Sequence, residues 1–141
     1  MTTTLEPGTV LVDYPVGEIT RDRMVAVMEV MGDLNPIHED EELARRLGFR
    51  GIVNQGPANL AYVVNMLMDR LGVDAGHVKL LDFRFHDNVV PGDALIARGE
   101  VTALRDKGQV TEVDCSFRLD MAGGAPRLSG SATIEVPRAR P

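Results

Sequence analysis

The sequence has little of several residue types, and each shortage argues against a class of protein. Its single cysteine, Cys115, has no second thiol with which to form an intrachain disulfide, which fits a reducing cytoplasm. The net charge is −6 and the few aromatic residues do not alternate with Lys or Arg clusters, so we expect no nucleic-acid-binding surface. No segment approaches the roughly 18 consecutive apolar residues of a membrane-spanning helix, so no membrane partner is expected.

The N-terminal residues and the length of the chain suggest a simple organisation. The first seven residues lack a basic segment followed by an apolar stretch, so they do not have the pattern of a secretory signal. Together with the lone cysteine, this predicts a cytoplasmic protein. There is no internal repeat, low-complexity tract or linker, so residues 1–141 are expected to form one domain whose core needs no disulfide or metal.

The segment Asp33-Leu34-Asn35-Pro36-Ile37-His38 contains the most specific pattern of residues. A carboxylate and an imidazole lie five residues apart, and the turn-forming pair Asn35-Pro36 lies between them. Both side chains are common general acids and bases, so the spacing predicts an acid–base site. An Asp and an Asn after a helix are, by themselves, more often turn and capping residues, so the prediction depends on the rest of the chain.

Two short helices are predicted on either side of this loop. The first has Thr20 as a candidate N-cap and is expected to end at Gly32, directly before the loop. Its apolar residues recur at helical spacing: Met24, Val27, Met28 and Met31. The second is expected to begin at Asp40 and to end at Gly48. Its apolar face consists of Leu43, Ala44 and Leu47.

A long apolar helix is predicted over residues 58–71. Pro57 suits its first turn, where no amide donor is needed. Apolar residues lie on nearly every side of it, which is typical of a helix that is buried all round. At about 1.5 Å per residue, such a helix is roughly 20–25 Å long and needs other elements to surround it.

Strands are predicted in the second half of the chain, after a first strand over residues 8–15. Apolar and polar residues alternate over 81–86, 95–103, 113–121 and 128–136, and Gly123-Gly124 marks a hairpin turn. This alternation predicts an antiparallel sheet with one dry and one wet face. A sheet packed on a helix belongs to the α+β class.

These features together resemble the MaoC-like (R)-specific enoyl-CoA hydratase family of hotdog-fold proteins. The family signature Gly-Asp-x-Asn-Pro-x-His-x-Asp is matched over residues 32–40, and Phe49 and Gly56 precede the central helix at the expected spacing. A Phe-rich strand, a Pro-Gly-Asp turn and a Gly-x-Val strand are matched by Phe83, Phe85, Pro91, Gly92, Asp93, Gly99 and Val101. The resemblance covers nearly the whole chain and implies a single hotdog domain, an antiparallel sheet wrapped around a long central helix.

The resemblance also implies an activity. It is that of a hydro-lyase that adds water to a trans-2-enoyl thioester to give an (R)-3-hydroxyacyl thioester, or catalyses the reverse dehydration, with no metal or organic cofactor. Asp33 would be the principal base, His38 would share and orient the water, and the Gly56 N–H would bind the thioester oxygen. The expected supporting or substrate-binding residues are Asn35, Gln55 and Pro57.

The expected substrate is an acyl-CoA or acyl-carrier-protein thioester. The phosphates of coenzyme A would need a local basic patch, for which the candidates are Arg45, Arg46, Arg50 and Arg84. The resemblance implies a homodimer in which the sheets of the two subunits join edge to edge. A higher oligomer or a heterodimer stays open. Three other functions are considered: a catalytic or non-catalytic subunit of a heteromeric dehydratase, an acyl-thioester-binding protein, and a thioesterase. The thioesterase is disfavoured because residues 54–57 offer no carboxylate.

Two positions depart from the family pattern. Gln55 stands where relatives usually have a His, and Val64 stands where many have a small hydroxyl residue. Neither position belongs to the acid–base pair, so the departures affect the expected substrate more than the expected reaction. Among the remaining candidates, His77 and His86 are expected at the surface, and Cys115 is expected to pack in the core.

Overall fold

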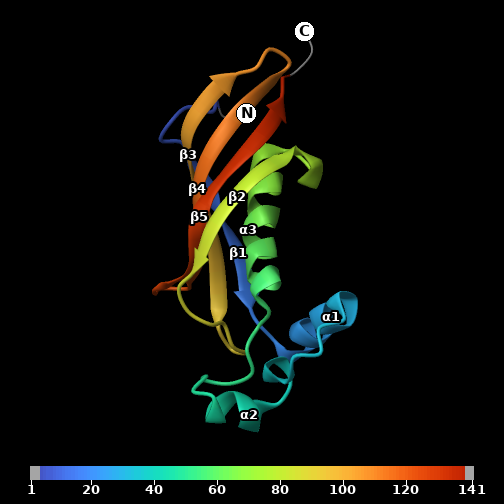
Figure 1. The fold of residues 1–141 in the computed structure, drawn as a ribbon. Helices are drawn as coiled ribbons and strands as arrows, with labels where there is room; N and C mark the ends of the chain where they lie inside the picture. Colours follow the sequence, from blue (N-terminus) through green and yellow to red (C-terminus); the bar gives the residue numbers. More distant parts are fainter. Residues whose placement is uncertain (1–3, 139–141) are drawn as a thin grey trace.

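The computed structural model describes residues 4–138, and Figure 1 shows a single sheet packed along one long helix. The sheet has five strands: β1 (Val10–Glu18), β2 (Val78–Phe85), β3 (Ala94–Asp106), β4 (Val110–Met121) and β5 (Pro126–Pro137). Their order is β1-β3-β4-β5-β2, and every neighbouring pair is antiparallel. The long helix is α3 (Gly56–Leu71), and the shorter helices are α1 (Arg21–Met31), η1 (Pro36–His38), α2 (Glu41–Arg46) and η2 (Ala75–His77). The predicted α+β class and antiparallel sheet are confirmed.

The face of the sheet toward α3 is apolar, as the alternating pattern predicts. Its buried side chains come from the three inner strands: Leu95, Ala97, Val101, Val113, Cys115, Phe117, Leu119, Leu128, Ala132 and Ile134. The edge strand β2 differs, because Phe83 and Phe85 are 39% and 47% exposed. β2 has a neighbour on one side only, β5, so its aromatic side chains are only partly covered.

Helix α3 has Pro57 in its first turn, as predicted, but begins at Gly56, two residues before the predicted range, and it is capped at its end by Gly72, whose φ of 67° is left-handed. The expectation that it is buried on all sides is wrong for this chain. Its buried residues lie on the face toward the sheet: Ala58, Asn59, Val63, Met66, Leu67 and Leu71. Ala61, Asn65 and Asp69 are exposed, because the single sheet lies along one side of the helix (Figure 1).

Helices α1 and α2 lie beyond one end of the sheet (Figure 1). Both predicted N-caps are confirmed, since Thr20 accepts the Arg23 N–H at 3.2 Å and Asp40 accepts the Leu43 N–H at 2.9 Å. The apolar stripe of α1 is buried only at Met24, and Met31 is exposed near its C-terminal end. Capping therefore fixes where these helices begin, while their position beyond the sheet leaves part of their apolar surface uncovered.

Gly130 on β5 allows β2 to approach closely, which predicts a large loss of stability on substitution. A Cβ atom at this position would lie 2.1 Å from the Asp82 carbonyl oxygen and 2.8 Å from the Phe83 Cα, so the backbone of β2 would have to move. We expect Gly130→Ala to lower the free energy of unfolding by roughly 3 kcal/mol and the control Gly99→Ala by roughly 1 kcal/mol. The control is milder because its Cβ would meet only the ends of the Leu11 and Met66 side chains, both at 3.1 Å. Urea unfolding measures both values, and equal losses would contradict the prediction.

Candidate active site

Asp33 and His38 form a close pair in the loop between α1 and α2. The His38 Nε2 atom lies 3.1 Å from the Asp33 Oδ2 atom, and the His38 side chain is almost fully buried. The other ring nitrogen, Nδ1, lies 2.5 Å from the Val53 carbonyl oxygen. Because a carbonyl oxygen only accepts, Nδ1 carries hydrogen and donates. The Nε2 atom is therefore the ring nitrogen that faces the Asp33 carboxyl group.

The loop itself fixes the carboxylate. Asp33 Oδ1 accepts the Asn35 N–H at 3.0 Å, and the Asn35 side chain in turn accepts the Ile37 N–H at 3.3 Å. Pro36 occupies the first turn of η1, which ends at His38. Asn35 therefore holds the Asp33 carboxylate through its backbone and the loop amides through its side chain. These contacts form because Asp and Asn side chains readily accept from backbone amides two residues further on.

The segment that leads into α3 supports the imidazole from the other side. The Val53 N–H donates to the Ile37 carbonyl oxygen at 3.0 Å, and the Asn54 N–H donates to the Val89 carbonyl oxygen at 2.7 Å. The pairing of Val53 with Ile37 sets the carbonyl that accepts from His38. Val53 and Gly56 lie three residues apart, so the Asp33–His38 pair and the N-terminus of α3 are joined through one short buried stretch.

Gly56 is the first residue of α3 and packs against Phe85 of the edge strand. A Cβ atom at Gly56 would lie 3.0 Å from the Phe85 Cζ atom. The amides of a first helical turn have no acceptor within the helix, and the helix dipole makes this end positive. The arrangement suits an oxygen that gains negative charge. Pro57 follows in the same turn and is exposed.

Three buried amide side chains surround the start of α3. Asn54 donates to Asn59 through its Nδ2 atom at 2.7 Å from the Asn59 Oδ1 atom. Gln55 is only 1% exposed, and neither Nε2 nor Oε1 of its side chain has a hydrogen-bond partner in the described part of the chain. Gln55 therefore does not cap the helix. The pairing of Asn54 with Asn59 was not predicted, although two amides five residues apart across a helix start are a recognisable signal.

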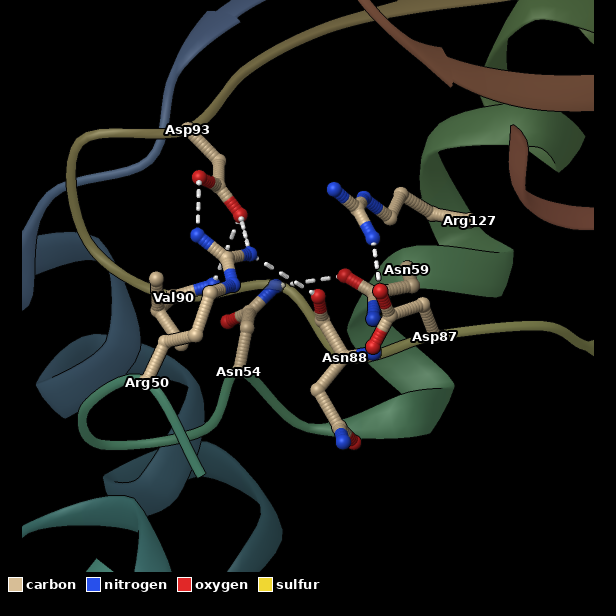
Figure 2. A network of polar contacts seen from close by, with 8 residues as sticks. All are labelled: Arg50, Asn54, Asn59, Asp87, Asn88, Val90, Asp93 and Arg127. Carbon is tan, nitrogen blue, oxygen red and sulfur yellow. Dashed lines mark hydrogen bonds and ion pairs between the residues drawn. The ribbon is translucent and has the colours of Figure 1, made fainter. Parts of the chain in front are cut away.

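A second polar group lies beside this segment and was also missed. Arg50 donates to both carboxylate oxygens of Asp93, from Nη1 at 3.1 Å and from Nη2 at 2.7 Å, and Nη2 also donates to the Asn88 carbonyl oxygen at 3.3 Å. Figure 2 shows the guanidinium group between these two partners, with a separate ion pair between Arg127 and Asp87 nearby. Asp93 Oδ2 also accepts the Val90 N–H at 3.1 Å. The buried Asp of the Pro-Gly-Asp turn was the signal that a cationic partner was needed.

The ion pair changes the pKa of Asp93 in a way that predicts a pH effect. Burial alone would raise this pKa, but the hydrogen bonds from Arg50 and Val90 and the charge of Arg50 outweigh burial and hold it below 3.8. A carboxylate with a lowered folded-state pKa stabilises the fold above its ordinary pKa, and this contribution is lost as the pH falls through the lower value. We expect Asp93→Asn to be less stable than the wild type at neutral pH and the difference to shrink below 3.8. Urea unfolding at a series of pH values measures this, and a constant difference would refute it.

The predicted basic patch forms only in part. Arg45 and Arg50 border a cavity of about 150 Å³ together with Arg21, next to Ile52. Arg45 is also paired with Glu41 at 2.7 Å. Arg84 lies elsewhere, on β2, where it borders a different hollow with His86. The patch prediction is therefore wrong in grouping Arg84 with the others, because Phe85 packs against Gly56 and the preceding residue of the strand, Arg84, points to the opposite face of the sheet.

The remaining candidate residues lie outside this region. Cys115 is buried on β4, and burial, followed by the charge of Asp114, raises the pKa of its thiol to about 12. His77 contacts Asp74, and His86 contacts Ser129. Among residues 4–138, no group of three His, Cys, Asp or Glu side chains is placed to hold a metal ion. Within the same range, none of the helices is both long and apolar enough to cross a membrane.

A sheet packed along one long helix, with an acid–base loop linked to the helix N-terminus, defines a hotdog-fold protein with a candidate acid–base site. Residues 5–120 match the model of the family described as the MaoC like domain, and the chain belongs to this family.

Solved structures agree with this assignment. The (R)-hydratase from A. caviae involved in PHA biosynthesis aligns with a TM-score of 0.83 at 24% identity, over 96% of this chain and 100% of that one. The R-hydratase PhaJ1 from Pseudomonas aeruginosa aligns with a TM-score of 0.82 at 26% identity, over 96% of this chain and 84% of that one. These alignments confirm the predicted hotdog fold.

One curated relative is similar in sequence. The peroxisomal enoyl-CoA hydratase 2 of Arabidopsis thaliana is 29% identical over 89 residues, which cover 62% of this chain. The aligned part is 29% of that protein, so the chain spans less than a third of the length of this relative.

Proposed function

We propose that the chain is a hydro-lyase that adds water to a trans-2-enoyl thioester to give an (R)-3-hydroxyacyl thioester, or catalyses the reverse dehydration. The observation that supports this best is the Asp33–His38 pair, 3.1 Å apart and linked through Val53 to the start of α3. The family assignment and the 26% identity to an R-hydratase support the same reaction. The substrate would be a thioester of coenzyme A or of an acyl carrier protein.

The proposed reaction needs a base, an oxyanion donor and a returned proton. Asp33 takes a proton from the water as its oxygen attacks Cβ, while the buried His38 orients that water. Negative charge moves to the thioester oxygen, where the Gly56 N–H donates to it with the help of the α3 dipole. The pair then returns a proton to Cα. The hydroxyl group is then bonded to Cβ and the proton to Cα, both on the same face of the double bond, which is syn addition.

The tautomer of His38 suits this role. Val53 keeps hydrogen on Nδ1, so Nε2 is the nitrogen that exchanges a proton with Asp33 or with the water. Because the carboxylate is held by the Asn35 amide, it keeps its place while its proton count changes. No step of this scheme needs an organic cofactor or a metal ion.

The proposed assembly is a homodimer in which the β2 edges of two sheets pair. Leu80, Phe83 and Phe85 on this edge are exposed apolar side chains that a second copy would cover. A higher oligomer and a heteromer remain alternatives, because similar folds occur in the ChsH1-ChsH2 and HadBC complexes from Mycobacterium tuberculosis. With Asp33 and His38 both present, the chain would be the catalytic subunit of such a heteromer. Light scattering of the purified chain distinguishes a monomer from a dimer.

The cytoplasmic location stays a prediction that rests on the lone, buried Cys115. The Arabidopsis relative is named as a peroxisomal protein.

The purified chain mixed with crotonyl-CoA and longer trans-2-enoyl-CoAs tests the proposed function. Hydration removes the conjugated double bond, so the thioester absorbance is expected to fall at a rate proportional to enzyme. A folded dimer without activity toward any of these substrates, or toward carrier-protein thioesters, would contradict the proposal. Tight binding of an enoyl thioester without turnover, unchanged by Asp33→Asn, would instead indicate an acyl-thioester-binding protein.

A further inference from the structure

The Arg50–Asp93 ion pair joins two segments that are 43 residues apart in the chain. One is the stretch 50–56 that leads into α3, and the other is the turn between β2 and β3. Asp93 is 5% exposed, and it receives hydrogen bonds from two guanidinium nitrogens and from the Val90 amide. Charge-assisted bonds to a buried carboxylate are stronger and more directional than neutral ones. The position of Arg50 relative to this turn is therefore well determined.

The stretch that Arg50 begins carries two parts of the site. Val53, three residues later, supplies the carbonyl oxygen that accepts from His38 at 2.5 Å. Gly56, three residues after that, is the first residue of α3 and the proposed oxyanion donor. Residues 51–55 are all buried, and Asn54 is tied to Val89 in the same β2–β3 connection that Arg50 contacts through Asn88. Figure 2 shows Arg50, Asn54, Asn88, Val90 and Asp93 grouped around this connection.

The Arg50–Asp93 pair also differs from the other ion pairs in what it holds. Arg105 pairs with Glu112 and Asp114, but these residues lie on the adjacent strands β3 and β4, which their backbone hydrogen bonds already align. Arg50 lies in a loop of irregular backbone, so its side chain supplies contacts that no ladder replaces. The nearby pair of Arg127 and Asp87 connects β5 to the end of β2 and does not include the 50–56 stretch.

We propose that Arg50 is a positioning residue for the hydration reaction, which acts through Asp93 and adds to the Val53–Ile37 backbone hydrogen bond in fixing the Val53 carbonyl and the Gly56 amide. This inference rests on the proposed function. Without the guanidinium group, the 50–56 stretch keeps the backbone hydrogen bond from Asn54 to Val89 but loses its side-chain links to Asn88 and Asp93, so the His38 ring and the Gly56 N–H are held less firmly. Misplacement of reacting groups by about 1 Å costs on the order of 10²-fold in rate. Substrate affinity changes little, because Arg50 touches the protein and not the reacting atoms.

The test compares Arg50→Met with the control Arg105→Met in the 141-residue chain. Both substitutions remove a half-exposed arginine that is paired with carboxylates. We expect Arg50→Met to lower kcat by about 10-fold to 100-fold, with KM for crotonyl-CoA and the Kd of unreactive butyryl-CoA nearly unchanged. Arg105→Met should keep the wild-type kcat. Circular dichroism and thermal unfolding show whether each variant is folded.

Two further measurements separate positioning from a general loss of structure. Arg50→Lys keeps the charge beside Asp93 but has a single donor nitrogen in place of the two that bind the Asp93 carboxylate. Its kcat should therefore lie between those of the wild type and Arg50→Met. With Arg50→Ala, guanidinium ions at a non-denaturing concentration should restore part of kcat, and the same concentration of sodium chloride should not. If Arg50→Met does not fold, Arg50→Lys decides, and a folded Lys variant with wild-type kcat overturns the inference.

Each outcome bears on one proposal. An inactive wild type overturns the proposed function, whatever the variants do. An active wild type with equal kcat for Arg50→Met overturns the positioning role and leaves the hydratase in place. A raised KM and Kd at unchanged kcat also overturns it, because Arg50 would then contact the substrate, for example a phosphate of coenzyme A in the cavity beside Arg21 and Arg45.

Discussion

Replacing Asp33 with asparagine is expected to lower the rate of enoyl-thioester hydration by about 10²–10⁴-fold. The substitution removes the base that takes the proton from water, and it leaves the loop intact. Asparagine retains a side-chain oxygen that can accept the Asn35 N–H, as Asp33 Oδ1 does at 3.0 Å. Its amide group can donate to the His38 Nε2 atom, which lies 3.1 Å from the present carboxylate oxygen. Steady-state kinetics with crotonyl-CoA measures the loss, which should appear in kcat.

The matched control for this substitution is Asp40→Asn. Asp40 caps α2 by accepting the Leu43 N–H at 2.9 Å, and asparagine is an equally good N-cap. One carboxylate is lost from the same region in both variants, so they share the change in net charge. Asp40→Asn should keep the wild-type rate within about twofold, since asparagine preserves the α2 cap and Asp40 is not part of the proposed acid–base pair. Similar rates for Asp33→Asn and the wild type would exclude Asp33 as the base.

Replacing Gly56 with proline is expected to lower kcat by about 10²–10³-fold relative to replacing it with alanine. Both variants add a Cβ atom that would lie 3.0 Å from the Phe85 Cζ atom, so both need the same small shift of that ring. Only proline removes the N–H that is proposed to bind the thioester oxygen. Proline is tolerated in a first helical turn, and the extended Gln55, at φ −62° and ψ 136°, suits the position before it.

The comparison of proline with alanine isolates the amide from the steric effect. Gly56→Ala should lose some activity through the contact with Phe85, and Gly56→Ala combined with Phe85→Leu should recover part of it. Far-ultraviolet circular dichroism checks that α3 is retained in each variant. If the proline and alanine variants have the same kcat, the Gly56 N–H does not stabilise the transition state, and another donor must be sought at this helix end.

The parts of the fold that the sequence predicted are those that local patterns determine. The alternation along β3, β4 and β5 follows from one buried and one solvated face, so Ala97, Val101 and Leu119 could be assigned to the core. Thr20, Gly32 and Asp40 mark helix ends because their side chains or backbone satisfy free amides and carbonyls. The loop from Asp33 to His38 is short enough that the closeness of its carboxylate and imidazole followed from spacing and the family resemblance.

Other features depend on contacts between distant segments, and the sequence did not reveal them. The pairing of Arg50 with Asp93 spans 43 residues and needs the β2–β3 turn to fold against the start of α3. The acceptor for His38 is a backbone carbonyl, Val53, which has no side-chain signal. The exposed side of α3 was missed because its apolar composition predicts burial, whereas the number of faces that a single sheet covers is a property of the whole fold.

The configuration of the product formed from crotonyl-CoA tests the central proposal most directly. The purified chain is incubated with the substrate, the thioester is hydrolysed, and the 3-hydroxybutyrate is resolved by chiral chromatography. The proposed site predicts the (R) enantiomer from the wild type and almost no product from Asp33→Asn. Formation of the (S) enantiomer, or equal product from the two proteins, would contradict the proposed hydration by Asp33 and His38.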